Sequence, residues 1–125
     1  IDLVGMAMVE MVLNLSAENI AGSKQRGQVG GDVYWHGSQG GVVKLKERKV
    51  RVKRPRLRRK TQGKGAEVEI PAYTAMQKDA VGERMLEILL KGVSTRKYEQ
   101  VLPALAETVG IKKSSVKPYG PVKPR

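Results

Sequence analysis

The stretch VKLKERKVRVKR, residues 43–54, decides the fold of this 125-residue chain. Its aliphatic side chains occupy every second position in residues 43–45 and again in residues 50–52, with lysines or arginines between them. Alternation with a period of two places successive side chains on opposite faces of a strand. The stretch therefore predicts a short β-hairpin with its turn at residues 46–49, one aliphatic face and one face of lysines and arginines.

The segments on either side of the hairpin contain prolines and glycines, which end or interrupt regular secondary structure. Because Pro55 cannot donate to a ladder, we expect the second strand to end near Arg54 or to lie at an edge. Residues 58–66 (RRKTQGKGA) predict a flexible linker, and residues 22–41, with seven glycines, predict a loop. The glycines precede a strand instead of joining a strand to a helix, which excludes a phosphate-binding nucleotide loop.

Three neighbouring rings, those of Tyr34, Trp35 and His36, lie within the glycine-rich stretch. Rings of this kind stack on the bases of single-stranded nucleic acids. The alternative is a small hydrophobic cluster beneath a loop, and the sequence leaves both interpretations open.

The positive charge of the chain is concentrated around the hairpin. The net charge is +12, from 24 Lys and Arg against 12 Asp and Glu. Residues 23–65 contain 14 of the basic residues and only two acidic ones, so they hold the whole excess. Such a density of like charge repels itself unless a polyanion is bound, and a two-stranded ribbon fits a DNA groove. An ordinary basic surface hairpin is the alternative.

Residue types that are missing narrow the possible functions. The chain has no cysteine and a single histidine, His36, so disulfides, thiolate metal sites and cysteine nucleophiles are excluded. Residues 3–15 are apolar but shorter than the ~20 residues of a membrane span, and no basic region precedes them as in a secretory signal. We expect a cytoplasmic protein that binds a polyanion and has no membrane partner. The first residue, Ile1, hints at a fragment.

The N-terminal segment predicts an amphipathic helix that ends near Gly22. Its apolar stripe has helical spacing and comprises Val4, Met8, Met11, Val12 and Leu15. This stripe is large for a lone terminal helix. We expect it to pack on the C-terminal helices, and a seam between two copies in a homo-oligomer is the alternative.

The C-terminal half predicts one short strand followed by helices. Residues 67–73 alternate as a strand that Pro71 closes. A helix then follows from Asp79, whose carboxylate suits an N-cap, and it ends at Gly92.

A second and a third helix complete this half. Ser94 or Thr95 is expected to cap the second helix, which Pro103 either kinks or begins anew and Gly110 ends. Ser114 is expected to cap the third. Short helices joined by tight turns suit a helix-turn-helix unit, in which the third helix would contact the DNA bases; a purely structural helical hairpin is the alternative.

Two stretches together resemble a known family. Residues 36–57 (HGSQGGVVKLKERKVRVKRPRL) and residues 91–116 (KGVSTRKYEQVLPALAETVGIKKSSV) resemble consecutive segments of mutator-type bacterial insertion-sequence transposases. The run at 92–97 is the most distinctive match, and residues 113–116 match the start of the family's base-contacting helix. Pro118 departs from the family pattern because, with a second proline three residues later, it predicts an extended tail.

The resemblance implies a function in DNA transposition. The full-length enzyme of that family binds the terminal inverted repeats of its element and cuts DNA through an Asp-Asp-Glu set that holds a divalent metal such as Mg²⁺. The segment seen here precedes that catalytic domain, and none of the acidic residues of this chain can be carried over to the triad. We therefore expect no cofactor, no metal site and no catalytic activity in this chain alone.

The combined prediction is an α+β protein made of four parts. These are an N-terminal helix at 1–22, a glycine-rich loop and basic hairpin at 23–65, a helix-turn-helix-like unit at 66–116 and an extended tail at 117–125. The predicted DNA-binding residues are Lys44, Lys46, Arg48, Lys49, Arg51, Lys53, Arg54, Arg56, Arg58, Arg59, Ser94, Thr95, Arg96, Lys112, Lys113, Ser114 and Ser115. A small basic RNA-associated protein of the ribosomal type is the alternative function.

Overall fold

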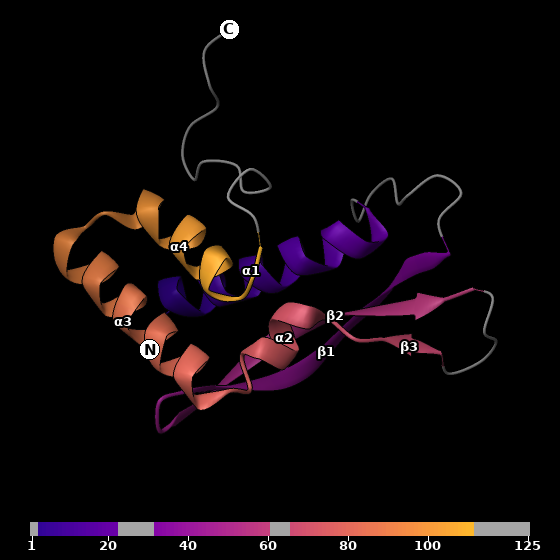
Figure 1. Cartoon of the computed structure of the whole chain (residues 1–125), viewed down its shortest axis with the longest axis horizontal. Helices are drawn as coiled ribbons and strands as arrows, with labels where there is room; N and C mark the ends of the chain where they lie inside the picture. The colour runs from indigo at the N-terminus through magenta and orange to yellow at the C-terminus, as the bar shows by residue number, and fades with distance from the viewer. Residues whose placement is uncertain (1–2, 23–31, 61–65, 112–125) are drawn as a thin grey trace, which may run out of the picture.

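A long antiparallel β-ribbon forms one side of the molecule, and the helices pack together on the opposite side of the molecule (Figure 1). The computed structural model describes residues 3–22, 32–60 and 66–111. In chain order its elements are α1 (Leu3–Ala21), β1 (Val33–Leu45), β2 (Arg48–Arg59), β3 (Glu67–Val68), α2 (Pro71–Ala75), α3 (Asp79–Thr95), the 3₁₀ turn η1 (Tyr98–Gln100) and α4 (Val101–Thr108). The predicted α+β class and the predicted order of helix, hairpin and helices are confirmed.

The predicted hairpin is present, and it is longer than the sequence indicated. β1 and β2 pair from Leu45 opposite Arg48 back to Val33 opposite Arg59, so the turn consists of two residues and not four. Lys46 takes a left-handed conformation in this turn, with φ of 62°. The predicted loop at 22–41 is therefore wrong from Val33 onward, where the chain is already a strand.

β2 continues beyond Pro55 to Arg59, so the prediction that it ends near Arg54 is wrong, as is a linker that begins at residue 58. The open edge of β2 explains this difference. The Lys53 N–H points to that edge, and because alternate residues of a strand orient alike, the nitrogen of Pro55 faces the same edge. β3 pairs only with Leu57 and Arg58, so no ladder hydrogen bond is lost at the proline.

A bulge in β1 interrupts the ribbon. His36 and Gly37 together oppose the single residue Arg56, between the pairs Trp35–Leu57 and Ser38–Pro55. Gly37 has a φ of +74°, which glycine adopts at little cost. A two-against-one bulge of this kind bends the strand and increases its twist.

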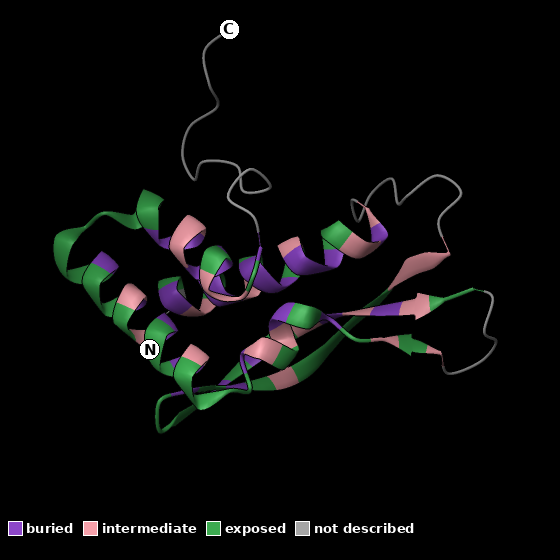
Figure 2. Ribbon diagram, viewed as in Figure 1, coloured by how far each residue is buried: buried purple, intermediate pink, exposed green. Residues whose placement is uncertain are grey.

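α1 forms as predicted, and its buried face agrees with the predicted stripe only in part, since Met8 and Val12 are buried as predicted. Val9 and Leu13 are fully buried, whereas Val4 and Met11 from the predicted stripe are 47% and 36% exposed. The helix is apolar on almost every side, so its spacing alone could not identify the buried face. Contacts with β2, α2 and α4 decide it instead, and Figure 2 shows the resulting inward purple stripe along the helix.

The helices after the sheet begin and end at other residues than predicted. Pro71 begins α2 instead of closing a strand, a common role at a first helical position. Asp79 is the first residue of α3 and not its cap, since Lys78 occupies the N-cap position without a side-chain hydrogen bond. α3 also continues through Gly92 to Thr95, and the left-handed residue that ends it is Arg96.

α4 follows after one 3₁₀ turn, with Pro103 in its first turn, where a missing N–H costs no helical hydrogen bond. Gly110 ends this part of the chain with a φ of +91°, as predicted. The third helix expected from Ser114 and the tail at 117–125 fall outside the described residues.

The core is aliphatic and continuous. Leu13 of α1, Leu45 and Leu57 of the ribbon, Met85 of α3 and Leu105 of α4 are all essentially inaccessible and belong to one cluster. Within the ranges that the structure describes, no helix is both long enough and apolar enough to cross a membrane.

Candidate nucleic-acid interface

The outer surface of the ribbon tip is formed by cations. Lys49, Arg51 and Lys53 of β2 are exposed, while the intervening Val50 and Val52 are only 8% and 4% exposed. The alternation predicted from the sequence thus separates the two faces over this half of the strand, because the aliphatic face packs on the helices.

Beyond Arg54 the cations change from odd to even positions of β2. Pro55 and Leu57 are buried, whereas Arg54, Arg56 and Arg58 are half-buried and reach the surface. The change lies next to the bulge opposite Arg56, and Arg54 stays on the face of Val52, where its Cδ and the Tyr73 hydroxyl both lie close to Gly41.

Cations are therefore present along the whole length of β2, on one face of the strand up to Lys53 and on the opposite face at Arg54, Arg56 and Arg58. The strand has 12 residues, and at ~3.3 Å per residue it is about 40 Å long. One turn of B-DNA measures ~34–36 Å, so the row of cations is as long as one turn of duplex.

The tip of the ribbon adds further charge. Lys46 lies in the turn and Arg48 directly follows it, and both are exposed. Lys44 is also exposed and forms an ion pair with Asp79, the first residue of α3, at 3.2 Å. This pair ties the ribbon tip to the helix.

Two arginines of the row are neutralised by carboxylates. Arg56 donates two hydrogen bonds to Oε1 of Glu67, at 2.7 and 3.1 Å, and these bonds hold the pKa of Glu67 below its ordinary value. Arg59 lies 3.7 Å from a carboxylate oxygen of Asp32. Within the described part of the chain, no ion pair involves the remaining cations of the ribbon, which are Lys46, Arg48, Lys49, Arg51, Lys53, Arg54, Arg58 and Lys60.

Arg54 is oriented by neutral groups. Its guanidinium lies 4.9 Å from the centroid of the Tyr73 ring and donates from Nη2 to Oε1 of Gln39 at 3.2 Å. Its Nε, like that of Arg58, is buried without a hydrogen-bond partner. Neutral contacts hold the side chain in place and leave its charge uncompensated.

The ring residues 34–36 are part of β1 and not of a loop. Trp35 packs against the core and donates from Nε1 to the carbonyl of Gly22 at 2.9 Å. Tyr34 and His36 meet edge to face, with 6.2 Å between ring centroids, and Tyr34 pairs across the ribbon with Arg58. Trp35 therefore has a packing role, and of the three residues only Tyr34 is paired directly with an arginine of β2.

The other predicted DNA-binding residues do not join this surface. Ser94 and Thr95 donate from their hydroxyls to the carbonyl of Lys91, which satisfies an acceptor at the end of α3. Ser94 and Thr95 are the last two of the 17 residues of α3, which begins at Asp79 beside the ribbon tip, and Arg96 is its C-cap. At 1.5 Å per residue all three lie roughly 25 Å along the helix from the tip. Lys112, Lys113, Ser114 and Ser115 are outside the described residues.

Sequence reasoning missed the residues that support the ribbon from its two edges. The Tyr73 hydroxyl accepts from the N–H of Val42 on the β1 edge, and Glu10 accepts from the N–H of Lys53 on the β2 edge at 2.7 Å. The role of Glu10 could have been suspected from the sequence, since it is the one charged residue in the apolar run 3–15. The role of Tyr73 could not, because its contact depends on where α2 crosses the sheet.

Comparison with protein-family models, with curated proteins and with solved structures gives no significant match for this chain. Within residues 3–22, 32–60 and 66–111, the structure has no group of three or more His, Cys, Asp or Glu side chains suited to a metal ion.

Proposed function

We propose that this chain is the DNA-binding portion of a mutator-type transposase, which recognises insertion-element ends at their terminal inverted repeats. The observation that supports the proposal is the row of cations along β2, most of which have no carboxylate partner among the described residues. A surface of this kind is balanced by negative charge, which the phosphates of a polyanion can provide. Binding then releases the small ions that were condensed on the polyanion, with a gain in entropy. The resemblance of residues 36–57 and 91–116 supplies the particular family.

The ribbon is suited to contact phosphates. Lysine and arginine side chains bind phosphate oxygens of any sequence and determine where the protein sits on the duplex. The resemblance to the transposase family assigns the recognition of particular bases to the segment after Ile111. The ribbon then supplies most of the affinity and little of the specificity.

The salt dependence of binding tests this proposal. If about six phosphates are neutralised, the logarithm of the association constant falls with the logarithm of salt concentration with a slope of about −5, since each contact contributes about −0.9. We expect fluorescence anisotropy with a labelled duplex to give this slope. A slope near zero would refute the proposal.

Charge variants locate the contact. Replacing Arg51 and Lys53 together by Gln is expected to reduce the slope by about two contacts. Lys97→Gln is the matched control, because Lys97 is exposed and follows the end of α3 that is farther from the ribbon tip. An equal reduction of the slope per removed charge in the double variant and in the control would show that net charge alone attracts the DNA.

The RNA-associated alternative is tested in the same assay. A structured RNA hairpin of matched length is compared with the DNA duplex at equal salt concentration. Tighter binding to the duplex supports the transposase proposal, and tighter binding to the RNA favours the ribosomal-type function.

A further inference from the structure

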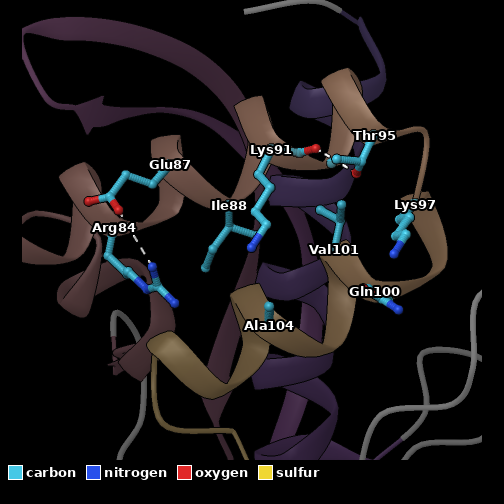
Figure 3. A pocket seen from close by; sticks show the side chains of 10 residues that line it. Arg84, Glu87, Ile88, Lys91, Thr95, Lys97, Gln100, Val101 and Ala104 are labelled. Atoms are coloured by element: carbon cyan, nitrogen blue, oxygen red, sulfur yellow. Dashed lines mark hydrogen bonds and ion pairs between the residues drawn. The ribbon is translucent and has the colours of Figure 1, made fainter.

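A second charged surface lies between α3 and α4, in a groove of about 440 Å³ (Figure 3). Its floor is apolar and includes Ile88 of α3 together with Val101 and Ala104 of α4. Arg84, Lys91 and Lys97 contribute to its rim.

Close helix packing determines the width of this groove. A Cβ atom on Gly92 would lie 2.3 Å from Cγ2 of Val101. The two helices therefore approach each other at a position where only glycine fits, and this contact closes one end of the groove. It is a built feature of the α3–α4 pair and not a gap between loosely packed elements.

The rim carries a net positive charge, with Arg84, Lys91 and Lys97 against Glu87, which also lines the groove. Arg84 is paired with Glu87 at 3.5 Å, whereas no ion pair among the described residues involves Lys91 or Lys97. Figure 3 shows the Lys91 side chain extending between Ile88 and Val101 with its amine toward α4. Arg84 and Lys91 are seven residues apart on α3, which corresponds to ~10.5 Å along the axis.

We propose that this groove binds an acidic amphipathic α-helix of a partner protein. A helix laid in a groove buries its apolar side chains on the floor and recognises its site at spacings of three, four and seven residues. Acidic residues seven apart on such a helix match the spacing of Arg84 and Lys91, and apolar residues between them reach Ile88 and Ala104. A single-stranded nucleic acid fits less well, because its bases need rings to stack on and the floor of the groove is aliphatic.

This site is independent of the ribbon. None of the residues that line the groove belongs to β1 or β2, and its lining comes from the far part of α3 together with η1 and α4. Failure of DNA binding by the ribbon therefore leaves this proposal intact, and the reverse also holds.

The test uses a synthetic helix of three heptads, with Leu at the core positions and Glu on both flanks, carrying a fluorescent label. Anisotropy is measured with the full 125-residue chain. We expect saturable binding, and we expect Lys91→Glu to weaken it about tenfold, since reversing one rim charge costs on the order of 1.4 kcal/mol. A second peptide with Ser in place of Leu keeps the charge and is expected to bind at least tenfold more weakly.

Lys78→Glu is the matched control, being an exposed lysine that does not line the groove. It is expected to change peptide affinity less than twofold. Equal weakening by Lys78→Glu and Lys91→Glu, or equal binding of the Leu and Ser peptides, would overturn the proposal in favour of non-specific attraction. Displacement of the peptide by duplex DNA, with Lys91→Glu weakening DNA binding to the same extent, would overturn it in favour of a nucleic-acid contact.

Discussion

Gly82 of α3 lies directly against the backbone of Lys44 in the ribbon, so that a Cβ atom on Gly82 would be 2.0 Å from the Lys44 carbonyl oxygen. The ion pair between the Lys44 amine and Asp79 adds a second contact between the ribbon and the N-terminus of α3. A glycine and a salt bridge thus hold the base of α3 on the tip of the basic hairpin.

This close approach predicts a large effect of Gly82→Ala. Helix propensity alone would favour alanine by about 1 kcal/mol. The backbone carbonyl cannot move aside as a flexible side chain could, and overpacking of this kind costs about 2–3 kcal/mol. We expect the free energy of unfolding, measured with urea, to fall by about that amount. A rise would show that α3 does not rest on the ribbon as described.

Gly40 is expected to respond in the opposite sense. It is exposed in β1, has no atom within 4 Å of a built Cβ and does not adopt a positive φ. Glycine within a strand costs about 0.5–1 kcal/mol in chain entropy, and valine favours strands. Gly40→Val should therefore raise the midpoint of urea unfolding, and it also serves as the control for Gly82→Ala. A clear fall would mean that the surface at Gly40 is occupied in the folded protein.

The hairpin could be predicted from the sequence because a single face of it is buried at the tip. Residues 43–45 and 50–52 alternate strictly, and their aliphatic side chains are the buried ones, so the pattern and the burial agree. The extension of β2 beyond Pro55 could not be predicted in this way. There the buried positions change parity at the bulge opposite Arg56, and that change depends on tertiary packing.

The helical segments show the same limit. α1 is apolar on nearly every side, so its existence could be predicted but not its buried face, which includes Val9 and Leu13. A glycine after a lysine is typical of a helix end, yet Gly92 lies inside α3. Glycine is needed there because Val101 packs too close to leave room for a Cβ atom. The basic surface of the candidate site was predictable from charge, whereas the orienting contacts of Arg54 required the position of Tyr73.

Glu67 predicts a pH dependence of stability. Hydrogen bonds from Arg56 lower the pKa of its carboxyl, with some opposition from desolvation. A carboxyl whose folded pKa lies below its unfolded value stabilises the protein above the unfolded pKa, and this contribution is lost as the pH falls through the folded pKa. Because the side chain is 37% exposed, we expect the effect to be small.

The measurement compares unfolding curves of the natural protein and Glu67→Gln at neutral and acidic pH. The stability difference between them should shrink as the pH falls, whereas for Glu87→Gln, whose arginine partner is more exposed, it should vary less. A difference independent of pH would show that the Arg56–Glu67 pair does not form in solution.

The Glu10 carboxylate predicts a local effect on the ribbon edge. Oε2 of Glu10 accepts the N–H of Lys53 at 2.7 Å, at a point of β2 that β3 does not reach. Hydrogen bonds to charged acceptors contribute about 1.5–3 kcal/mol when sheltered and less at a surface, so Glu10→Ala should lower the free energy of unfolding by about 1 kcal/mol. Amide hydrogen exchange of Lys53 should accelerate more than that of the buried Val50. Glu10→Gln keeps an acceptor oxygen and should restore part of the protection, while equal exchange in all three proteins would show that α1 does not cap this edge.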